Sequence, residues 1–178
     1  AAVAGELRSL LLGGRVQEVL AVDRFAVGFE IYASSSSEPD SHPTKPRAAG
    51  QRHYLLVSAD PSEGGRIHLV PHKLRRGQET PSPLLLRLRK NVEGARFTRI
   101  WQPPHERILH LTLSSADQAL TLVVEAMGRI CNIILVEEDG TILECMRRVA
   151  SHQSRYRVVL PGHPYVPPPP QKKVLTAA

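Results

Sequence analysis

The chain has 178 residues, of which 42% are hydrophobic and only 4% aromatic, so it can form one well-cored domain built mainly from aliphatic side chains. Its 23 basic and 17 acidic residues give a formal net charge of +6, which permits a polyanionic partner without requiring one. No apolar run approaches the roughly 20 residues that a membrane helix needs. The apolar N-terminus is interrupted by Glu6 and Arg8 without a preceding basic region. We therefore predict a cytoplasmic chain with no signal peptide and no membrane contact.

The first half of the chain reads as one helix followed by four strands. Residues 2–12 show helical periodicity, with one apolar face and the stop signal Gly13–Gly14. The predicted face consists of Val3, Leu7, Leu10 and Leu11. Alternating apolar residues then predict strands over 15–22, 25–33, 52–59 and 65–71. Residues 34–50 are rich in Ser and Pro and have no periodicity, so we predict a long mobile loop there.

The second half reads as another helix followed by five strands. Pro83 is suited to the first helical turn, and Gly94 to the end of the helix. The core face predicted for this helix consists of Leu84, Leu85, Leu88 and Val92. Further strands are predicted over 95–102, 106–115, 120–127, 132–140 and 141–149, with a hairpin turn at Glu137–Gly140. The pattern predicts an α+β fold, a mainly antiparallel two-layer β-sandwich with flanking helices. Residues 1–166 form the predicted domain, and residues 167–178 a proline-rich linker leading out of it.

The sequence offers no constellation typical of catalysis. Neither Gly-Gly pair belongs to a phosphate-binding loop, and no serine lies in a G-x-S-x-G motif. The eight histidines lack the acidic or cysteine partners of a zinc site. Cys131 and Cys145 each lie in an apolar run and are expected to be buried free thiols. We therefore predict a chain that is not an enzyme and that has no cofactor, no metal and no small-molecule substrate.

Basic side chains form the more coherent pattern. They occupy the polar side of the second helix, the strand that follows it, the start of the next strand and the C-terminal region. These residues are Arg87, Arg89, Lys90, Arg96, Arg99, Arg107, Arg147, Arg148, Arg155 and Arg157. If the strands bring them together, they form a surface for phosphate groups. The alternative is the solvated rim of a small domain, and composition leaves both readings open.

Three ordered motifs resemble those of one family. In "PSPLLLRLRKNVEGARFTRIWQPPHERILHL" the residues Leu88, Arg89, Lys90, Gly94, Gln102 and Arg107 fit the family pattern, and Glu106 takes the place of its Asp. The segment "EAMGRICNIIL" fits through Glu125, Met127, Gly128, Arg129 and Asn132, and "SRYRVVLPGHPYVPPPPQ" fits the closing motif. "GGRV" and "RIHL" agree as well. Together these motifs resemble the N-terminal domain of the NFACT family over essentially the whole chain.

The resemblance implies a β-sandwich similar to the N-terminal domain of formamidopyrimidine-DNA glycosylase. It also implies a role in ribosome-associated quality control: binding the large ribosomal subunit with its stalled peptidyl-tRNA, and recruiting tRNA for C-terminal alanine tailing. The resemblance implies tRNA contact through the pair Glu106 and Arg107. We add Arg89, Lys90 and Arg129 to the predicted RNA-binding residues, because their charge can neutralise the RNA backbone. Arg107 can pair with phosphate or stack on a base, while Glu106 can orient it or accept from a base amino group.

Several alternatives stay open. The family's older name, fibronectin-binding protein A, suggests an extracellular adhesin, and the related fold suggests a DNA glycosylase-like protein. Arg89 has Glu93 as a possible partner four residues on, and Glu125 and Arg129 have each other. Trp101, the sole tryptophan, is interpreted as a core or edge packing residue in preference to a base-stacking platform.

Overall fold

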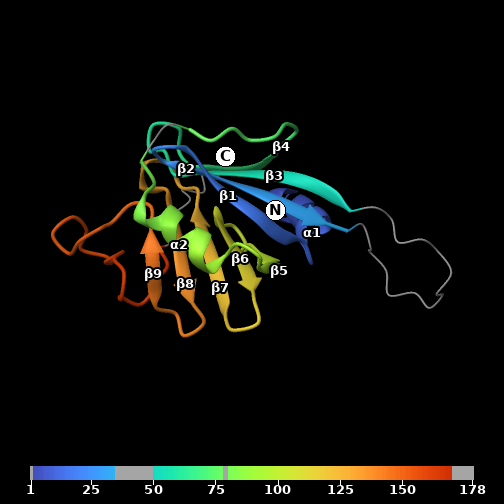
Figure 1. Ribbon diagram of the computed structural model, residues 1–178. Helices are drawn as coiled ribbons and strands as arrows, with labels where there is room; N and C mark the ends of the chain where they lie inside the picture. Colours follow the sequence, from blue (N-terminus) through green and yellow to red (C-terminus); the bar gives the residue numbers. More distant parts are fainter. Residues whose placement is uncertain (1, 35–49, 78–79, 170–178) are drawn as a thin grey trace, which may run out of the picture.

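The computed structural model describes residues 2–34, 50–77 and 80–169 (Figure 1). Within these ranges, two helices and nine strands follow in the predicted order, with a short 3-10 helix added. The elements are α1 (Ala2–Leu11), β1 (Arg15–Asp23), β2 (Ala26–Ala33), β3 (Gln51–Ser58), β4 (Arg66–Val70), α2 (Pro83–Asn91), β5 (Arg96–Trp101), β6 (Ile108–Ser114), β7 (Ala119–Glu125), η1 (Gly128–Ile130), β8 (Asn132–Glu137) and β9 (Ile142–Cys145). The predicted mobile loop over 34–50 lies outside the described residues except for its two ends. Most of the predicted linker over 167–178 lies outside them too.

The strands form one antiparallel sheet with the order β4-β3-β2-β1-β5-β6-β7-β8-β9. At its centre β1 and β5 are joined only through the pairing of Arg15 with Arg96. The sheet therefore consists of two halves, and Figure 1 shows β1–β4 crossing above β5–β9. Phe29 and Leu55 from the first half share one buried core with Leu111 and Ile133 from the second. The α+β class is confirmed, although the two layers are halves of one continuous sheet. The similarity to the glycosylase domain stays a prediction.

Helix α2 begins and packs as its sequence predicts. Ser82 caps it, because the Ser82 hydroxyl accepts a hydrogen bond from the Leu85 N–H at 3.2 Å. Pro83 occupies the first turn, where a backbone donor is not needed. The predicted apolar face is fully buried against β1 and β9. It consists of Leu84, Leu85, Leu88 and Val92, each at most 1% exposed.

The predicted face of α1 is partly wrong. Leu7 and Leu11 are buried, but Val3 and Leu10 are each 38% exposed. Ala4 takes their place in the core, because residues three, four and seven positions apart lie on one side of a helix. The buried face is thus narrower than the hydrophobic residues alone suggested.

The chain after β9 covers the outer face of the second half of the sheet. β9 ends at Cys145, so the strand predicted over 141–149 is too long. Val159 and Tyr165 from the following segment pack on Val123 and Ile134 in a second apolar cluster. Isolated bridges fasten this segment to the chain before it. The domain boundary at residue 166 stays a prediction. Neither helix in the described ranges is long and apolar enough to cross a membrane.

Candidate nucleic-acid interface

The Glu106–Arg107 pair lies in a braced turn between β5 and β6. The Gln102 side-chain amide donates to the backbone carbonyl of Glu106 at 2.6 Å, and the Glu106 N–H donates to the carbonyl of Pro103 at 3.3 Å. His105 closes the turn with a φ of 62°, a conformation uncommon for residues other than glycine. The turn and α1 line a small pocket together. Glu106 is half-buried and Arg107 exposed, so both side chains project from a backbone that is held in place.

Arg129 lies at the same end of the sheet. The backbone carbonyl of Arg107 accepts a hydrogen bond from Ala126 N–H at 2.8 Å, which ties the turn to the end of β7. The chain then forms η1, where Arg129 is exposed. Gly128 N–H donates to the carbonyl of Gly64 at 3.1 Å, so the turn between β3 and β4 reaches the same end. Glu106, Arg107 and Arg129 therefore form one group, which we call the end group.

Arg89 and Lys90 lie in the last turn of α2. Arg89 Nε donates to the carbonyl of Val19 at 3.2 Å, and the Glu93 carboxylate accepts from the Val19 N–H at 3.1 Å. These two side chains thus satisfy the backbone carbonyl and N–H of Val19, at a point where β1 has no pairing with β5. Arg89 and Glu93 bind one residue of β1, and among the described residues no ion pair joins them. Lys90 is exposed.

The five predicted residues form two groups rather than one. Arg89 and Lys90 precede Arg96, the first residue of β5, which pairs with Ser114 at the far end of β6. Arg107 precedes the first residue of β6. The seven-residue strand β6 therefore lies between the end group and the pair Arg89 and Lys90. Its length is roughly 20 Å, at about 3.4 Å per residue. A mononucleotide is too small to span this distance, whereas a polynucleotide has phosphates along its whole length.

Several arginines of the C-terminal region serve the fold instead of the surface. Glu125 is 1% exposed, and the Arg157 guanidinium binds its carboxylate through both terminal nitrogens. The Tyr165 hydroxyl donates to the same carboxylate at 2.8 Å. Burial, followed by the nearby Glu125 charge, raises the pKa of Tyr165 far above its ordinary value. The alternative pairing of Glu125 with Arg129 is therefore wrong.

Arg147 and Arg148 are also engaged within the chain. Arg147 Nη1 donates to the backbone carbonyls of Arg129 and Cys131 at 2.7 and 2.8 Å. Arg148 forms an ion pair with the buried Glu144 at 3.1 Å. The basic surface predicted from the C-terminal arginines is thus smaller than the sequence suggested. Arg147 also holds the backbone of Arg129 in place.

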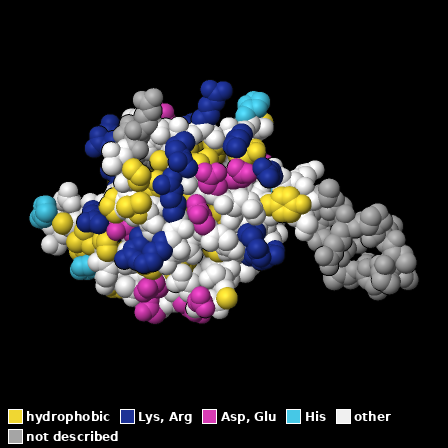
Figure 2. Space-filling model, viewed as in Figure 1, with side chains coloured by type: hydrophobic (Ala, Val, Ile, Leu, Met, Phe, Trp, Pro, Cys, Tyr) yellow, Lys and Arg dark blue, Asp and Glu magenta, His cyan; other side chains and the backbone are white. Residues whose placement is uncertain are grey.

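Charged side chains of both signs are spread over the face seen in Figure 2, where Lys and Arg alternate with Asp and Glu. This face carries no continuous basic patch. Net charge alone therefore does not define an interface on this face.

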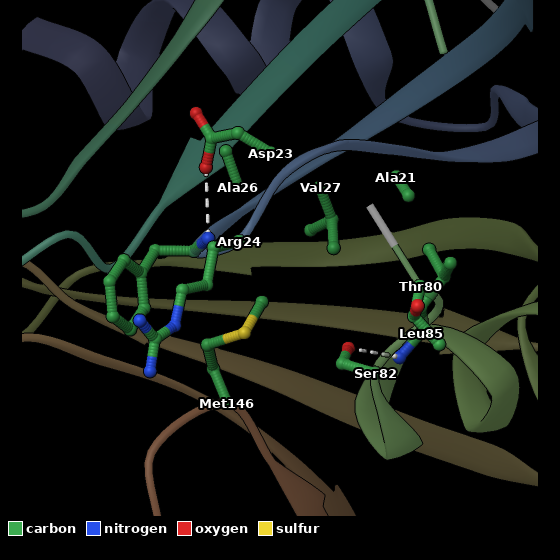
Figure 3. Close-up of a pocket in the computed structure, with 10 residues that line it drawn as sticks. Ala21, Asp23, Arg24, Ala26, Val27, Thr80, Ser82, Leu85 and Met146 are labelled. Atoms are coloured by element: carbon green, nitrogen blue, oxygen red, sulfur yellow. Dashed lines mark hydrogen bonds between the residues drawn. The ribbon is translucent and has the colours of Figure 1, made fainter. Parts of the chain in front are cut away.

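A pocket of about 260 Å³ lies between the β1–β2 turn and the start of α2. Figure 3 shows that two of its polar side chains, Asp23 and Ser82, form local hydrogen bonds. The Asp23 carboxylate accepts from the Phe25 N–H, and the Ser82 hydroxyl caps α2. No group of three or more metal-ligating side chains occurs within the described residues. The two cysteines are buried and free, as predicted.

Trp101 lies on a surface that the sequence did not predict. It is 41% exposed, whereas the sequence predicts a core or edge packing residue. Its ring lies 5.0 Å from the ring of His110 on β6, and the Arg99 guanidinium lies 5.3 Å from its centroid. The sequence signal for this exposed ring is the strand end Arg-Ile-Trp-Gln, where an aromatic residue lies just before the turn that holds Glu106 and Arg107.

These features define an α+β domain that displays cationic side chains from turns and a helix end around an antiparallel sheet. A family profile described as "NFACT N-terminal and middle domains" matches residues 1–177. The chain belongs to the NFACT family.

Relatives with names from ribosome quality control cover most of the chain. "Rqc2 homolog RqcH" of Streptococcus pneumoniae is 33% identical over 170 residues, which are 92% of this chain and 28% of that protein. The protein of the same name from Bacillus subtilis is 31% identical over 175 residues, which are 95% of this chain and 28% of that protein. "Ribosome quality control complex subunit 2" of Saccharomyces cerevisiae is 32% identical over 92 residues, which are 52% of this chain and 8% of that protein. The chain thus spans little more than a quarter of its bacterial relatives.

Solved structures with the same fold carry a different name. The N-terminal domain of fibronectin-binding protein PavA from Streptococcus pneumoniae superposes with a TM-score of 0.80 at 31% identity, covering 95% of this chain and 60% of that one. The N-terminal part of the fibronectin/fibrinogen-binding protein from Streptococcus suis gives a TM-score of 0.79 at 32% identity, covering 94% of this chain and 59% of that one.

Proposed function

We propose that this chain is an RNA-binding module of a ribosome-associated quality control factor. The names of its curated relatives support the setting. The single observation that carries RNA binding is the end group: Arg107 and Arg129 are exposed at one end of the sheet, and backbone hydrogen bonds hold both in place.

In this proposal the end group contacts the sugar–phosphate backbone of tRNA. A guanidinium forms two parallel hydrogen bonds with a phosphate and stacks on exposed bases. The described residues provide no ion-pair partner for either Arg107 or Arg129, so neither has to leave a carboxylate before binding phosphate. Glu106 lies beside Arg107 and is able to accept from a base amino group. This gives the turn one group for the backbone and one for a base.

Arg89 and Lys90, at the end of α2, add charge without strict geometry. Lys90 is exposed and free to move, which suits a point-charge contact with phosphate. Arg89 keeps its terminal guanidinium nitrogens for a ligand, since only its Nε is bound to Val19. Binding across both groups requires a ligand with phosphates about 20 Å apart, as in a folded RNA.

The wider role is part of the same proposal. Within a longer protein, the module would help to bind the large ribosomal subunit with its stalled peptidyl-tRNA. It would also help to recruit tRNA for alanine tailing in the cytoplasm. The module itself would bind without catalysing a reaction. The candidate favoured by the names of the structural neighbours is fibronectin binding, which requires an extracellular setting.

The test is tRNA binding by the 178-residue chain, measured by fluorescence anisotropy with labelled tRNA. The double variant Glu106→Ala/Arg107→Ala and the single variants Arg107→Gln and Arg129→Gln are compared with Arg76→Gln. The last is a matched control, because Arg76 is also exposed but pairs with Glu18 on β1. The double variant is expected to weaken binding about tenfold or more, roughly 1.4 kcal/mol, and Arg76→Gln less than about twofold. Equal binding by wild type and double variant, with both folded, would show that the pair is structural.

A further inference from the structure

One face of the second half of the sheet is only partly covered. The C-terminal segment packs over β7–β9, where Val123 and Ile134 are buried beneath it. Beside that covered part, the outer side chains of β5, and those of β6 from His110 onward, reach solvent. Along one row of this face Trp101 pairs with His110, and His110 with Val123. The face therefore passes from a buried apolar side at β8 to an exposed aromatic edge at β5.

The exposed edge consists of aromatic and basic side chains in mutual contact. The rings of Trp101 and His110 lie 5.0 Å apart and are inclined by 43°. The Arg99 guanidinium lies over the indole at 5.3 Å. The ring of Tyr165 meets His110 edge-on at 6.4 Å. Because Glu125 holds the Tyr165 hydroxyl, this row is anchored at its inner end and open at its outer end.

The remaining side chains of the face are small and polar. Thr112 and Thr121 lie opposite one another with their hydroxyl oxygens 3.3 Å apart. Thr98 and Ser114 form a second hydroxyl pair at 3.2 Å. The only acidic residue of β5, β6 and β7 is Glu125, which is buried and paired. An aromatic ring beside an arginine and hydroxyl groups, without exposed carboxylates, is complementary to an anionic chain that carries flat bases.

We propose that this face binds unpaired RNA, with a base stacked on Trp101 and the adjoining phosphate held by Arg99. The inference deepens the proposed function, on which it rests, by naming the part of the RNA that is bound. A paired base is hidden within its helix and presents no ring to the indole, whereas an unpaired base in a loop or at an end is free to stack. The face continues from the braced turn, since Gln102 follows Trp101 directly.

The sole tryptophan makes this contact directly measurable. Tryptophan fluorescence, excited selectively so that the four tyrosines do not contribute, reports on Trp101 alone in the wild-type chain. We would titrate the chain with a single-stranded oligouridylate of twelve nucleotides, a blunt RNA duplex of equal length and tRNA. Quenching by the single strand and by tRNA, with little effect of the duplex, is expected. Quenching by the duplex to the same degree, or no quenching by the single strand, would overturn the proposal.

Substitutions separate the face from the rest of the interface. Affinity of labelled oligouridylate is expected to fall roughly tenfold in Trp101→Ala, the loss of one stacked base. In Trp101→Phe, which keeps an aromatic ring, it should stay within about threefold. Tyr32→Ala is the control, because Tyr32 is 44% exposed on β2 in the other half of the sheet, and it should bind as the wild type does. Circular dichroism confirms that each variant is folded.

The outcomes distinguish the two proposals. Suppose that the wild type binds tRNA, and that Trp101→Ala binds both tRNA and oligouridylate as tightly as the wild type does. The stacking face is then refuted, and RNA binding through the end group stands. If wild type binds neither RNA, both proposals fail.

Discussion

Replacing Glu125 by Gln should destabilise the domain strongly without changing its shape. The Glu125 side chain is fully buried and the Arg157 side chain is 10% exposed. The substitution therefore leaves a buried guanidinium without its counter-charge. Removing one partner of a buried ion pair costs about 3–5 kcal/mol. We expect about 3 kcal/mol, the low end, because the amide oxygen still accepts one hydrogen bond. For a domain of this size that loss lowers Tm by roughly 6–12 °C.

Thermal unfolding followed by circular dichroism measures this effect. Arg76→Gln removes an exposed ion pair, in which Arg76 and Glu18 are 62% and 39% exposed, and should cost less than about 1 kcal/mol. The double variant Glu125→Gln/Arg157→Gln should be more stable than the sum of the two single losses predicts, because it leaves no unpaired buried charge. A Glu125→Gln variant that melts within about 2 °C of wild type, or strictly additive losses, would refute the reasoning.

Two further predictions concern the core and the thiols. Leu88→Ala should cost about 2–5 kcal/mol in chemical denaturation because Leu88 is fully buried, whereas Leu86→Ala in the same helix should cost under about 0.5 kcal/mol because Leu86 is 55% exposed; equal losses would contradict the placement of α2. Burial, followed by the Glu144 charge, raises the pKa of the Cys145 thiol from 9.0 to about 11. Neither Cys145 nor Cys131 should react with a thiol reagent at pH 8 until the chain unfolds. Fast labelling of the native protein would contradict this burial of the thiols. Because the folded-state pKa of Cys145 lies above its unfolded value, stability should fall between about pH 9 and pH 11.

Local sequence signals were sufficient for most of the fold. Ser82 and Pro83 mark the start of α2 because a side-chain cap and a residue without a backbone donor satisfy a helix N-terminus. Alternation of apolar residues identified every strand, because successive side chains of a strand point to opposite faces. Alternation predicted too long a strand at β9, because the chain after Cys145 leaves the sheet and covers its outer face.

Trp101 shows where alternation fails. Strict alternation places Phe97, Arg99 and Trp101 on one face, and Phe97 is buried in the core. A bulge between Phe97 and Arg99 shifts the register by one residue, so Ile100 turns inward and Trp101 outward. A single extra residue reverses the facing of every later side chain. Nothing in the local sequence predicts this bulge.

Long-range polar contacts were also beyond the sequence. Arg157 binds Glu125 across 32 positions, and Arg89 binds Val19 across 70. Both were predicted as members of a basic surface, because an exposed arginine and one that serves the fold look alike in sequence. The exposure of Arg107 and Arg129 agrees with their position beside turns, because turn residues lie at the surface.

The most direct test of the account compares two ligands for the same chain across a salt series. Binding of the wild-type chain is measured with tRNA and with fibronectin, and the tRNA titration is repeated with Arg107→Gln. The account predicts saturable tRNA binding that weakens as salt rises, a salt slope reduced by about 1 in Arg107→Gln, and no competition by fibronectin. Tight fibronectin binding together with salt-independent or absent tRNA binding would contradict it.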